Sequence, residues 1–158
     1  MRELSDLAGA RIPFAVRAGL PLRDLKRSFA GEDSVVRIRS EFFDGSLSDR
    51  VLAALLTQLR GRLAFTAMGG AYNRVAPDAT AFAHRNQRFL LEHIGEPAWV
   101  DASWNLAHAD GSGRVYPNFP DLALADGPAA YHGENLERLR AVKRAYDPDR
   151  FFDFPQAV

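Results

Sequence analysis

The sequence contains no cysteine among its 158 residues. That absence excludes disulfides, thiolate metal sites and the attachment of a cofactor through a cysteine from this chain. The four histidines are scattered, and no two of them have the spacing with which a helix presents a pair of metal ligands. We therefore expect no metal site in the chain.

The short motifs of several enzyme classes are missing as well. There is no Gly-x-Ser-x-Gly nucleophile turn, no phosphate-binding loop and no Gly-x-Gly-x-x-Gly fingerprint. Nothing in the sequence therefore supports a hydrolase or a self-sufficient nucleotide-binding domain. Twenty basic and twenty acidic residues cancel, whereas nucleic acids and anionic membranes attract proteins with a positive excess, so we expect neither as a partner.

Long apolar runs are also absent. None approaches the ~20 residues that a bilayer-spanning helix needs. The first residues after Met1 lack the apolar stretch of a signal peptide, so we expect a cytoplasmic protein. With 47% hydrophobic residues the chain can bury one core, so residues 1–158 are expected to form a single domain.

Apolar periodicity predicts a mixed fold. Alternation with a period of two predicts strands at residues 11–16, 35–43, 62–75, 80–85 and 87–94. Three-four spacing predicts helices at residues 21–29, 48–60 and 135–146. Residues 98–109 fit either element, and Ser46 or Ser48 can cap the second helix. Because the strands cluster like hairpins, the fold class expected is α+β, an antiparallel sheet with helices packed on one face.

Two adjacent glycines interrupt the third strand. Gly69 and Gly70 weaken a strand, and either a bulge or the close approach of a flat ligand would explain them. If the strand continues past them, Tyr72 and Arg74 share one of its faces and Asn73 points to the other. A tyrosine beside an arginine can hold an anionic group or polarise a substrate hydroxyl.

Two prolines stiffen the stretch from Gly113 to Asp121. Pro117 and Pro120 keep it extended but unable to serve as a central strand. Asn118, fixed between them, can offer a donor and an acceptor to a polar ring. The alternative is a surface loop with its aromatic residues packed underneath.

The last stretch is expected to have a structural role. An amphipathic helix ends where Asp147-Pro148 stops it, since proline cannot continue a helix. We expect Phe151 and Phe152, which follow, to fold back as an aromatic plug on the core.

Together, these stretches resemble the berberine-bridge-enzyme-like FAD-linked oxidases, within the vanillyl-alcohol-oxidase-type flavoproteins. The resemblance rests on Tyr-x-Asn-Phe, on Tyr-x-Gly-x-Asn-x-x-Arg-Leu-x-x-Val-Lys-x-x-Tyr-Asp-Pro-x-x-x-Phe, and on a terminal Gln. Upstream, Gly-Gly followed by Pro-Asp-x-Thr-Ala-Phe-x-His-Arg is also similar. The similarity runs from about Arg37 to the end, and the berberine-like segment covers about residues 114–158.

The resemblance implies a division of roles. The FAD-binding domain of the family precedes this region and is absent here, so the chain alone is not expected to bind FAD. The substrate domain is expected to cover the isoalloxazine ring of the flavin with its sheet. By this resemblance Tyr72, Arg74 and Tyr116 are catalytic candidates. The flavin-side candidates are Gly69, Gly70, Tyr116 and Asn118. The catalytic base has no unambiguous counterpart.

Two functions therefore stay open. The first is the substrate-domain portion of an FAD-dependent oxidoreductase that oxidises a small organic substrate, with its flavin domain on another chain or missing. The second is a flavin-free module that binds or cyclises a small molecule. Because a sheet built to cover a flavin domain would leave one face exposed, we expect a flavin-binding domain or subunit, or a second copy in a homodimer, as partner.

Overall fold

The computed structural model describes residue 21 and residues 36–158. The strand expected at 11–16, and all but the first residue of the helix expected at 21–29, lie outside the described residues. Residues 35–158 pack as one compact unit.

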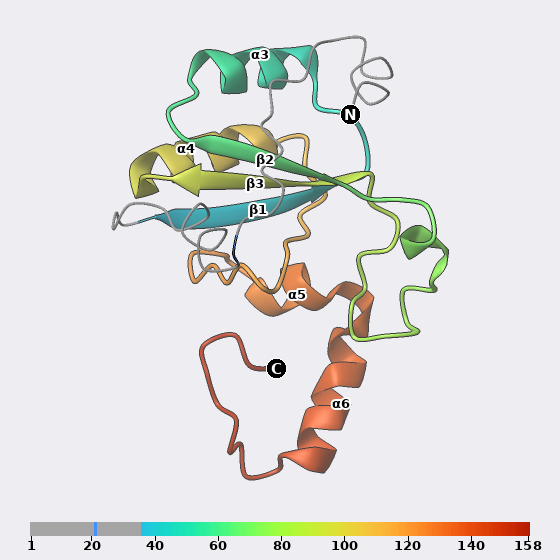
Figure 1. Cartoon of the computed structure of the whole chain (residues 1–158). Helices are drawn as coiled ribbons and strands as arrows, with labels where there is room; N and C mark the ends of the chain where they lie inside the picture. Colours follow the sequence, from blue (N-terminus) through green and yellow to red (C-terminus); the bar gives the residue numbers. More distant parts are fainter. Residues whose placement is uncertain (1–20, 22–35) are drawn as a thin grey trace. The chain divides into compact units, whose positions relative to one another are not determined.

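This unit contains one sheet and four helices in its described part. In chain order its elements are β1 (Arg37–Phe43), α3 (Asp49–Thr57), β2 (Arg62–Ala67), a 3-10 turn (Tyr72–Arg74), β3 (Phe89–Gly95), α4 (Pro97–His108), α5 (Gly127–His132), a second 3-10 turn (Gly133–Asn135) and α6 (Leu136–Tyr146). The strand order is β1-β3-β2, and both pairings are antiparallel. Figure 1 shows α3 and α4 on the same side of the sheet. The expected α+β fold, with helices on one face of an antiparallel sheet, is confirmed.

The register assigns each side chain of the sheet to one of two faces. On the face covered by α3 and α4, the core is formed by Phe43, Val51, Leu55, Leu91 and Ala107, and the ring of Phe89 stacks on that of Phe43 at 4.7 Å. On the other face, Phe42 lies opposite Leu90, which lies opposite Thr66. We call this second face, which also carries Glu92, the open face of the sheet.

The two covering helices begin at side-chain caps. Ser48, one of the two expected caps, accepts a hydrogen bond from the backbone N–H of Val51 at the start of α3. Glu96 accepts from the N–H groups of Ala98 and Trp99, and Pro97 occupies the first turn of α4. These start signals are why residues 98–109, which fitted either element, form a helix.

The strand expected at 62–75 is shorter than predicted. It ends at Ala67, because Gly69 and Gly70 have φ of 147° and 65°, which no regular strand contains. Tyr72 and Arg74 therefore lie in a 3-10 turn, and the prediction that they share a strand face is wrong. Residues 80–85 join no ladder, so the strand expected there is also wrong.

The C-terminal part differs from its prediction in one respect. Helix α6 forms as expected and extends away from the sheet (Figure 1), but none of its residues is buried. Phe151 and Phe152 are 84% and 67% exposed, so the predicted plug on the core is wrong. The physical reason is Asp147, whose carboxylate accepts hydrogen bonds from both phenylalanine N–H groups and turns the chain at the end of α6.

Among the described residues, no helix is long and apolar enough to cross a membrane.

A buried histidine gives this core a pH dependence. His93 is fully buried on the helix-covered face, where its Nδ1 lies 2.8 Å from the hydroxyl of Ser103. Its Nε2 has no partner among the described residues. Burial lowers the pKa of His93 from 6.5 to about 4. The folded protein therefore holds this ring neutral under mildly acidic conditions.

We expect His93 to destabilise the fold as the pH falls from 6.5 to about 4, because only the unfolded chain takes up the proton in that window. The loss should reach roughly 3 kcal/mol near the lower limit. The check is denaturant unfolding of the native chain and of His93→Gln across this window. Glu41, whose pKa is raised by burial, acts alike in both proteins, so their difference isolates His93. Parallel pH profiles would contradict the assignment.

Candidate functional site

A cavity of about 360 Å³ lies on the open face of the sheet. The sheet contributes Phe42, Thr66, Leu90 and Glu92 to its lining. The loops contribute Met68, Tyr72, Phe82, Arg85 and Tyr116. The volume is within the range of small-ligand pockets. Because α3 and α4 cover the opposite face, the pocket is separated from the core by the thickness of the sheet.

Tyr116 reaches this pocket because its segment docks on the edge of β1. We call residues 112–121 the edge segment. The N–H of Ser112 donates to the carbonyl of Phe42 at 2.9 Å, and the N–H of Phe42 donates to the carbonyl of Arg114 at 2.8 Å. The N–H of Tyr116 then donates to the hydroxyl of Ser40 at 3.0 Å. The far end is fixed by Asp121, whose carboxylate lies 2.6 Å from Nε of Arg39.

Tyr72 enters the pocket from the turn after the glycines. Its hydroxyl donates to the carbonyl of His84. The ring of Phe82 packs edge-on against both Tyr72, at 5.8 Å, and Tyr116, at 6.2 Å. Burial raises the pKa of Tyr72, although the charge of Arg85 opposes that shift, so the phenol keeps its proton at neutral pH. The structure thus brings Tyr72 and Tyr116, both singled out in the sequence, into one pocket.

The other candidates from the sequence lie outside the pocket lining. Arg74 is exposed in the 3-10 turn. A Cβ added to Gly69 or Gly70 would meet nothing within 4 Å, so in the described structure the glycines serve the turn and no group approaches them closely. Asn118 is exposed, but its Nδ2 donates to the Tyr116 hydroxyl at 2.8 Å, which places its amide beside the pocket. Their assigned roles stay predictions.

Two charged residues of the pocket were missed by sequence reasoning. Glu92 points from the central strand into the open face, and burial raises its pKa, while Arg62 lowers it less. Arg85 lies over the ring of Tyr72, 4.7 Å from its centroid. One signal for Glu92 was available: it is the only carboxylate in the apolar strand from Phe89 to Ile94. Arg85 ends the quoted Pro-Asp-x-Thr-Ala-Phe-x-His-Arg stretch, but no site role was predicted for it, because its place in the pocket depends on the fold of an irregular loop.

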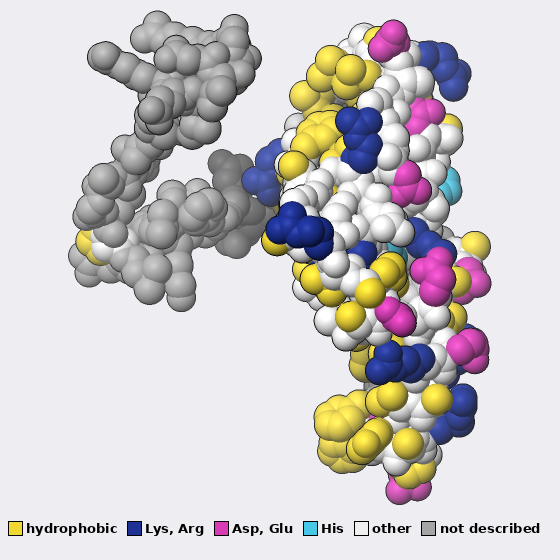
Figure 2. All heavy atoms as spheres, turned by 90° about the vertical axis from the view of Figure 1, so that its right-hand side faces the viewer, with side chains coloured by type: hydrophobic (Ala, Val, Ile, Leu, Met, Phe, Trp, Pro, Cys, Tyr) yellow, Lys and Arg dark blue, Asp and Glu magenta, His cyan; other side chains and the backbone are white. Residues whose placement is uncertain are grey.

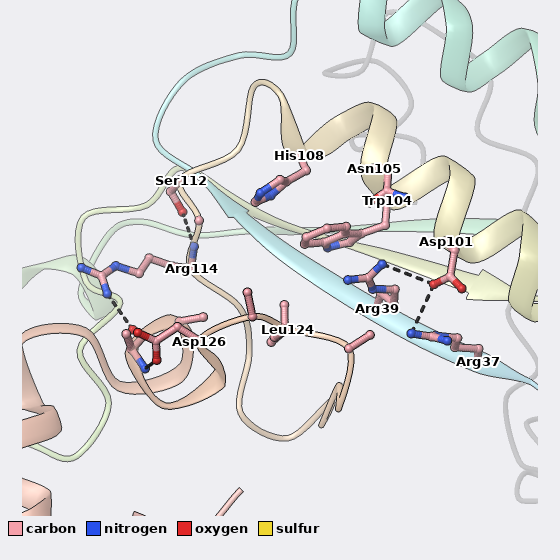
Figure 3. Close-up of a pocket in the computed structure, with 15 residues that line it drawn as sticks. Arg37, Arg39, Asp101, Trp104, Asn105, His108, Ser112, Arg114, Leu124 and Asp126 are labelled. Carbon is pink, nitrogen blue, oxygen red and sulfur yellow. Dashed lines mark hydrogen bonds and ion pairs between the residues drawn. The ribbon is translucent and has the colours of Figure 1, made fainter.

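A larger cavity of about 770 Å³ lies between β1, α4 and the loop before α5. Figure 3 shows Arg37 and Arg39 on β1 beside Asp101 on α4, joined by ion pairs of 3.2 and 3.3 Å. Next to it, Glu41 is fully buried, and its carboxylate accepts from Nδ1 of His108 at 2.9 Å and from the N–H of Gly113 at 2.7 Å. Since these charged groups already satisfy one another, the smaller pocket is the better candidate for chemistry.

Comparison with known proteins finds a matching family model at the C-terminal end of the chain. Residues 115–158 match the family described as berberine and berberine like. That segment contains Tyr116 and Asn118 and supplies one wall of the pocket. The similarity to that family model is found for residues 115–158. We call them the berberine-like segment.

Relatives extend the similarity upstream of the berberine-like segment. The chain is 38% identical to the FAD-linked oxidoreductase YgaK of Bacillus subtilis over 102 residues, 58% of this chain and 22% of that protein. The structure of BBE-like 1 from Physcomitrella patens superposes with a TM-score of 0.72 at 25% identity, covering 78% of this chain and 30% of that one. Berberine bridge enzyme from Eschscholzia californica shares the fold, with a TM-score of 0.76 at 21% identity over 98% of this chain and 37% of its own. The chain thus spans about a fifth to two fifths of these proteins.

The pKa of Glu92 offers a direct test of the pocket's electrostatics. Removing the charge of Arg62 in Arg62→Gln should raise the Glu92 pKa further, because that guanidinium is the cation that opposes the effect of burial. The pKa is measured from the side-chain carboxyl resonance of Glu92 during a pH titration. Arg60→Gln, which removes an equal charge from an exposed position, should leave that pKa unchanged. A fall in the pKa of Glu92 in Arg62→Gln would contradict the arrangement.

Proposed function

We propose that this chain forms the substrate-side part of an FAD-linked oxidoreductase that oxidises a small organic substrate in the open-face pocket. The observation that carries the proposal is Glu92, a carboxylate with a raised pKa inside a pocket walled by aromatic rings. A base of this kind is what proton abstraction from a substrate requires. The similarity to FAD-linked oxidoreductases supports the same reaction class.

The pocket suits one face of a planar, polar ring. Tyr72, Phe82 and Tyr116 supply aromatic walls, and the Asn118 amide at the rim offers an acceptor to a ring N–H. We therefore expect Tyr116 and Asn118 to lie on the flavin side. No phosphate-binding loop is present among residues 36–158, so the rest of FAD would be held by a separate flavin-binding part.

FAD, when bound, supplies the acceptor for a hydride from the substrate. Within this chain, Glu92 takes the proton of the substrate hydroxyl, because burial makes its carboxylate more basic than an exposed one. The Tyr116 hydroxyl accepts from Asn118, which leaves its own O–H free to donate to the substrate oxygen. Tyr72 already donates to the His84 carbonyl, so its hydroxyl oxygen can only accept.

Replacing Glu92 by Gln should test this role. Glu92→Gln keeps the shape of the side chain but cannot take a proton, so substrate oxidation should fall by at least about a hundredfold. The measurement is the rate at which substrate bleaches the visible flavin absorbance in the chain assembled with its flavin-binding part. In the native assembly that rate should decline as the pH falls through the raised pKa of Glu92, because the protonated carboxyl is not a base.

Glu137→Gln, an exposed change on α6, serves as the matched control and should oxidise substrate at the native rate. Native activity in Glu92→Gln would remove Glu92 from the mechanism and leave the open-face pocket as a binding site without a base.

The partner that covers this chain should be the flavin-binding part. The berberine-like segment ends in an aromatic patch formed by Tyr146, Phe151, Phe152 and Phe154, each at least 58% exposed. Figure 2 shows hydrophobic side chains gathered at that end of the molecule. Contiguous apolar surface of this kind is normally buried against a partner. The relatives' much greater length supports a flavin-binding part as the occupant.

Without that part, we expect the aromatic patch to pair with itself. Light scattering of the isolated chain should then show a mass that rises with concentration toward a dimer. Changing Phe151 and Phe152 together to Ser should shift the chain toward monomer, because it removes two of the four aromatic rings of the patch. Leu122→Ser, at an equally exposed position on another loop, should have no such effect. A monodisperse native monomer at high concentration would count against the patch.

A further inference from the structure

The pocket holds two opposite charges that do not neutralise each other. Neither Glu92 nor Arg85 forms an ion pair with any residue that the structure describes, although both line the same cavity. The cation that acts on Glu92 is Arg62, whereas the charge of Arg85 acts on Tyr72. The cavity therefore contains an anionic and a cationic group with no ion pair between them.

Arg85 is held in place by contacts that leave its charge unpaired. Its guanidinium lies over two rings, 4.7 Å from the centroid of Tyr72 and 5.0 Å from that of Phe82. Nη2 donates to the hydroxyl of Thr80 at 2.9 Å, and Nε is shielded from solvent without an acceptor in the described part of the chain. The aromatic contacts and the hydroxyl fix the side chain, so little conformational entropy remains to be lost when a ligand binds.

An unpaired guanidinium beside apolar rings favours one ligand chemistry. Arginine binds carboxylates with charge-assisted and often bidentate hydrogen bonds. A neutral ligand would cover the guanidinium without supplying an acceptor of equal strength, and a polar group left unpaired in this way costs binding free energy. A carboxylate at the Arg85 end would satisfy it and leave the other end of the same molecule toward Glu92.

We propose that the substrate of this pocket is a small hydroxy acid, whose carboxylate pairs with Arg85 while its hydroxyl faces Glu92. This inference rests on the proposed function for the role of Glu92, but its carboxylate end stands on Arg85 alone. The step balances in this arrangement: the substrate carboxylate stays paired with Arg85, Glu92 becomes neutral when it takes the hydroxyl proton, and the charge left on that oxygen would be discharged as the hydride of the same carbon passes to the oxidised flavin that the flavin-binding part supplies.

The test compares two probes of one shape on the full 158-residue chain. They are para-hydroxymethylbenzoate and its neutral analogue para-hydroxymethylbenzamide. The acid should bind about tenfold more tightly, the effect of one hydrogen bond to a charged group. Its addition should also shift the side-chain Nε–H resonance of Arg85 in an NMR titration, and the amide should leave that resonance nearly unmoved.

Arg85→Gln and Arg88→Gln each remove one positive charge, so comparing them separates a direct contact with Arg85 from an effect of net charge. Arg85→Gln should bind acid and amide equally, whereas Arg85→Lys should keep part of the preference because it keeps the charge without the fork. Arg88→Gln is the matched control, since Arg88 is exposed and donates to Ser46 outside the pocket, and it should keep the full preference.

Three results would each overturn the proposal. They are equal binding of acid and amide by the native chain, failure of the acid to bind, and a preference for the acid that survives in Arg85→Gln. Its failure is distinguishable from failure of the proposed function. Glu92→Gln should keep the preference for the acid, because Arg85 is intact, while it abolishes substrate oxidation in the flavin-loaded assembly. If the native chain prefers the acid but Glu92→Gln oxidises substrate at the native rate, the carboxylate site at Arg85 is supported and the role of Glu92 as base is refuted.

Discussion

The arrangement of the pocket depends on the ion pair between Arg39 and Asp121. Arg39 is 5% exposed, and its guanidinium lies 3.7 Å from the centroid of the Trp104 ring. It therefore ties together β1, α4 and the end of the edge segment, three parts of the chain that are far apart in sequence. Both partners belong to a small network, because Arg39 also pairs with Asp101 at 3.3 Å and Asp121 also pairs with Arg37 at 3.1 Å. Together with the hydrogen bond from the Asp121 N–H to the Tyr131 hydroxyl at 2.7 Å, this network holds the distal end of the segment that presents Tyr116.

The sheet separates stability from chemistry. One face buries the apolar residues against α3 and α4, and the other carries the pocket, so period-two alternation along β3 sends Leu91 to the core and Glu92 to the site. The carboxylate of Glu92 lies on the face that carries the pocket and that α3 and α4 do not cover. The same alternation places His93 back in the core, where its ring must stay neutral. The adjacent residues Glu92 and His93 thus lie on opposite faces of the sheet, one lining the pocket and the other in the core.

Sequence periodicity was sufficient for the elements that bury one face. β1, β3 and α3 form close to where the apolar spacing predicts them, because each buries an apolar face. α6 also forms where its spacing predicts it, although none of its residues is buried. It was insufficient where backbone conformation decides, as at Gly69 and Gly70, whose positive φ angles end β2 early. The exposed end of α6 was mispredicted for a related reason, since hydrogen bonds to Asp147 outweigh the apolar character of the aromatic residues that follow.

The same distinction applies to the pocket. The family resemblance pointed to Tyr72 and Tyr116, and the structure places both in one cavity, although the strand face expected to carry Tyr72 does not exist. Arg85 also stands in a quoted stretch, but its place in the pocket was not predicted, because it follows from stacking on Tyr72 and Phe82, two rings that only the folded loop brings together. The contacts of Arg85 depend on an irregular loop, so they become visible only in the structure.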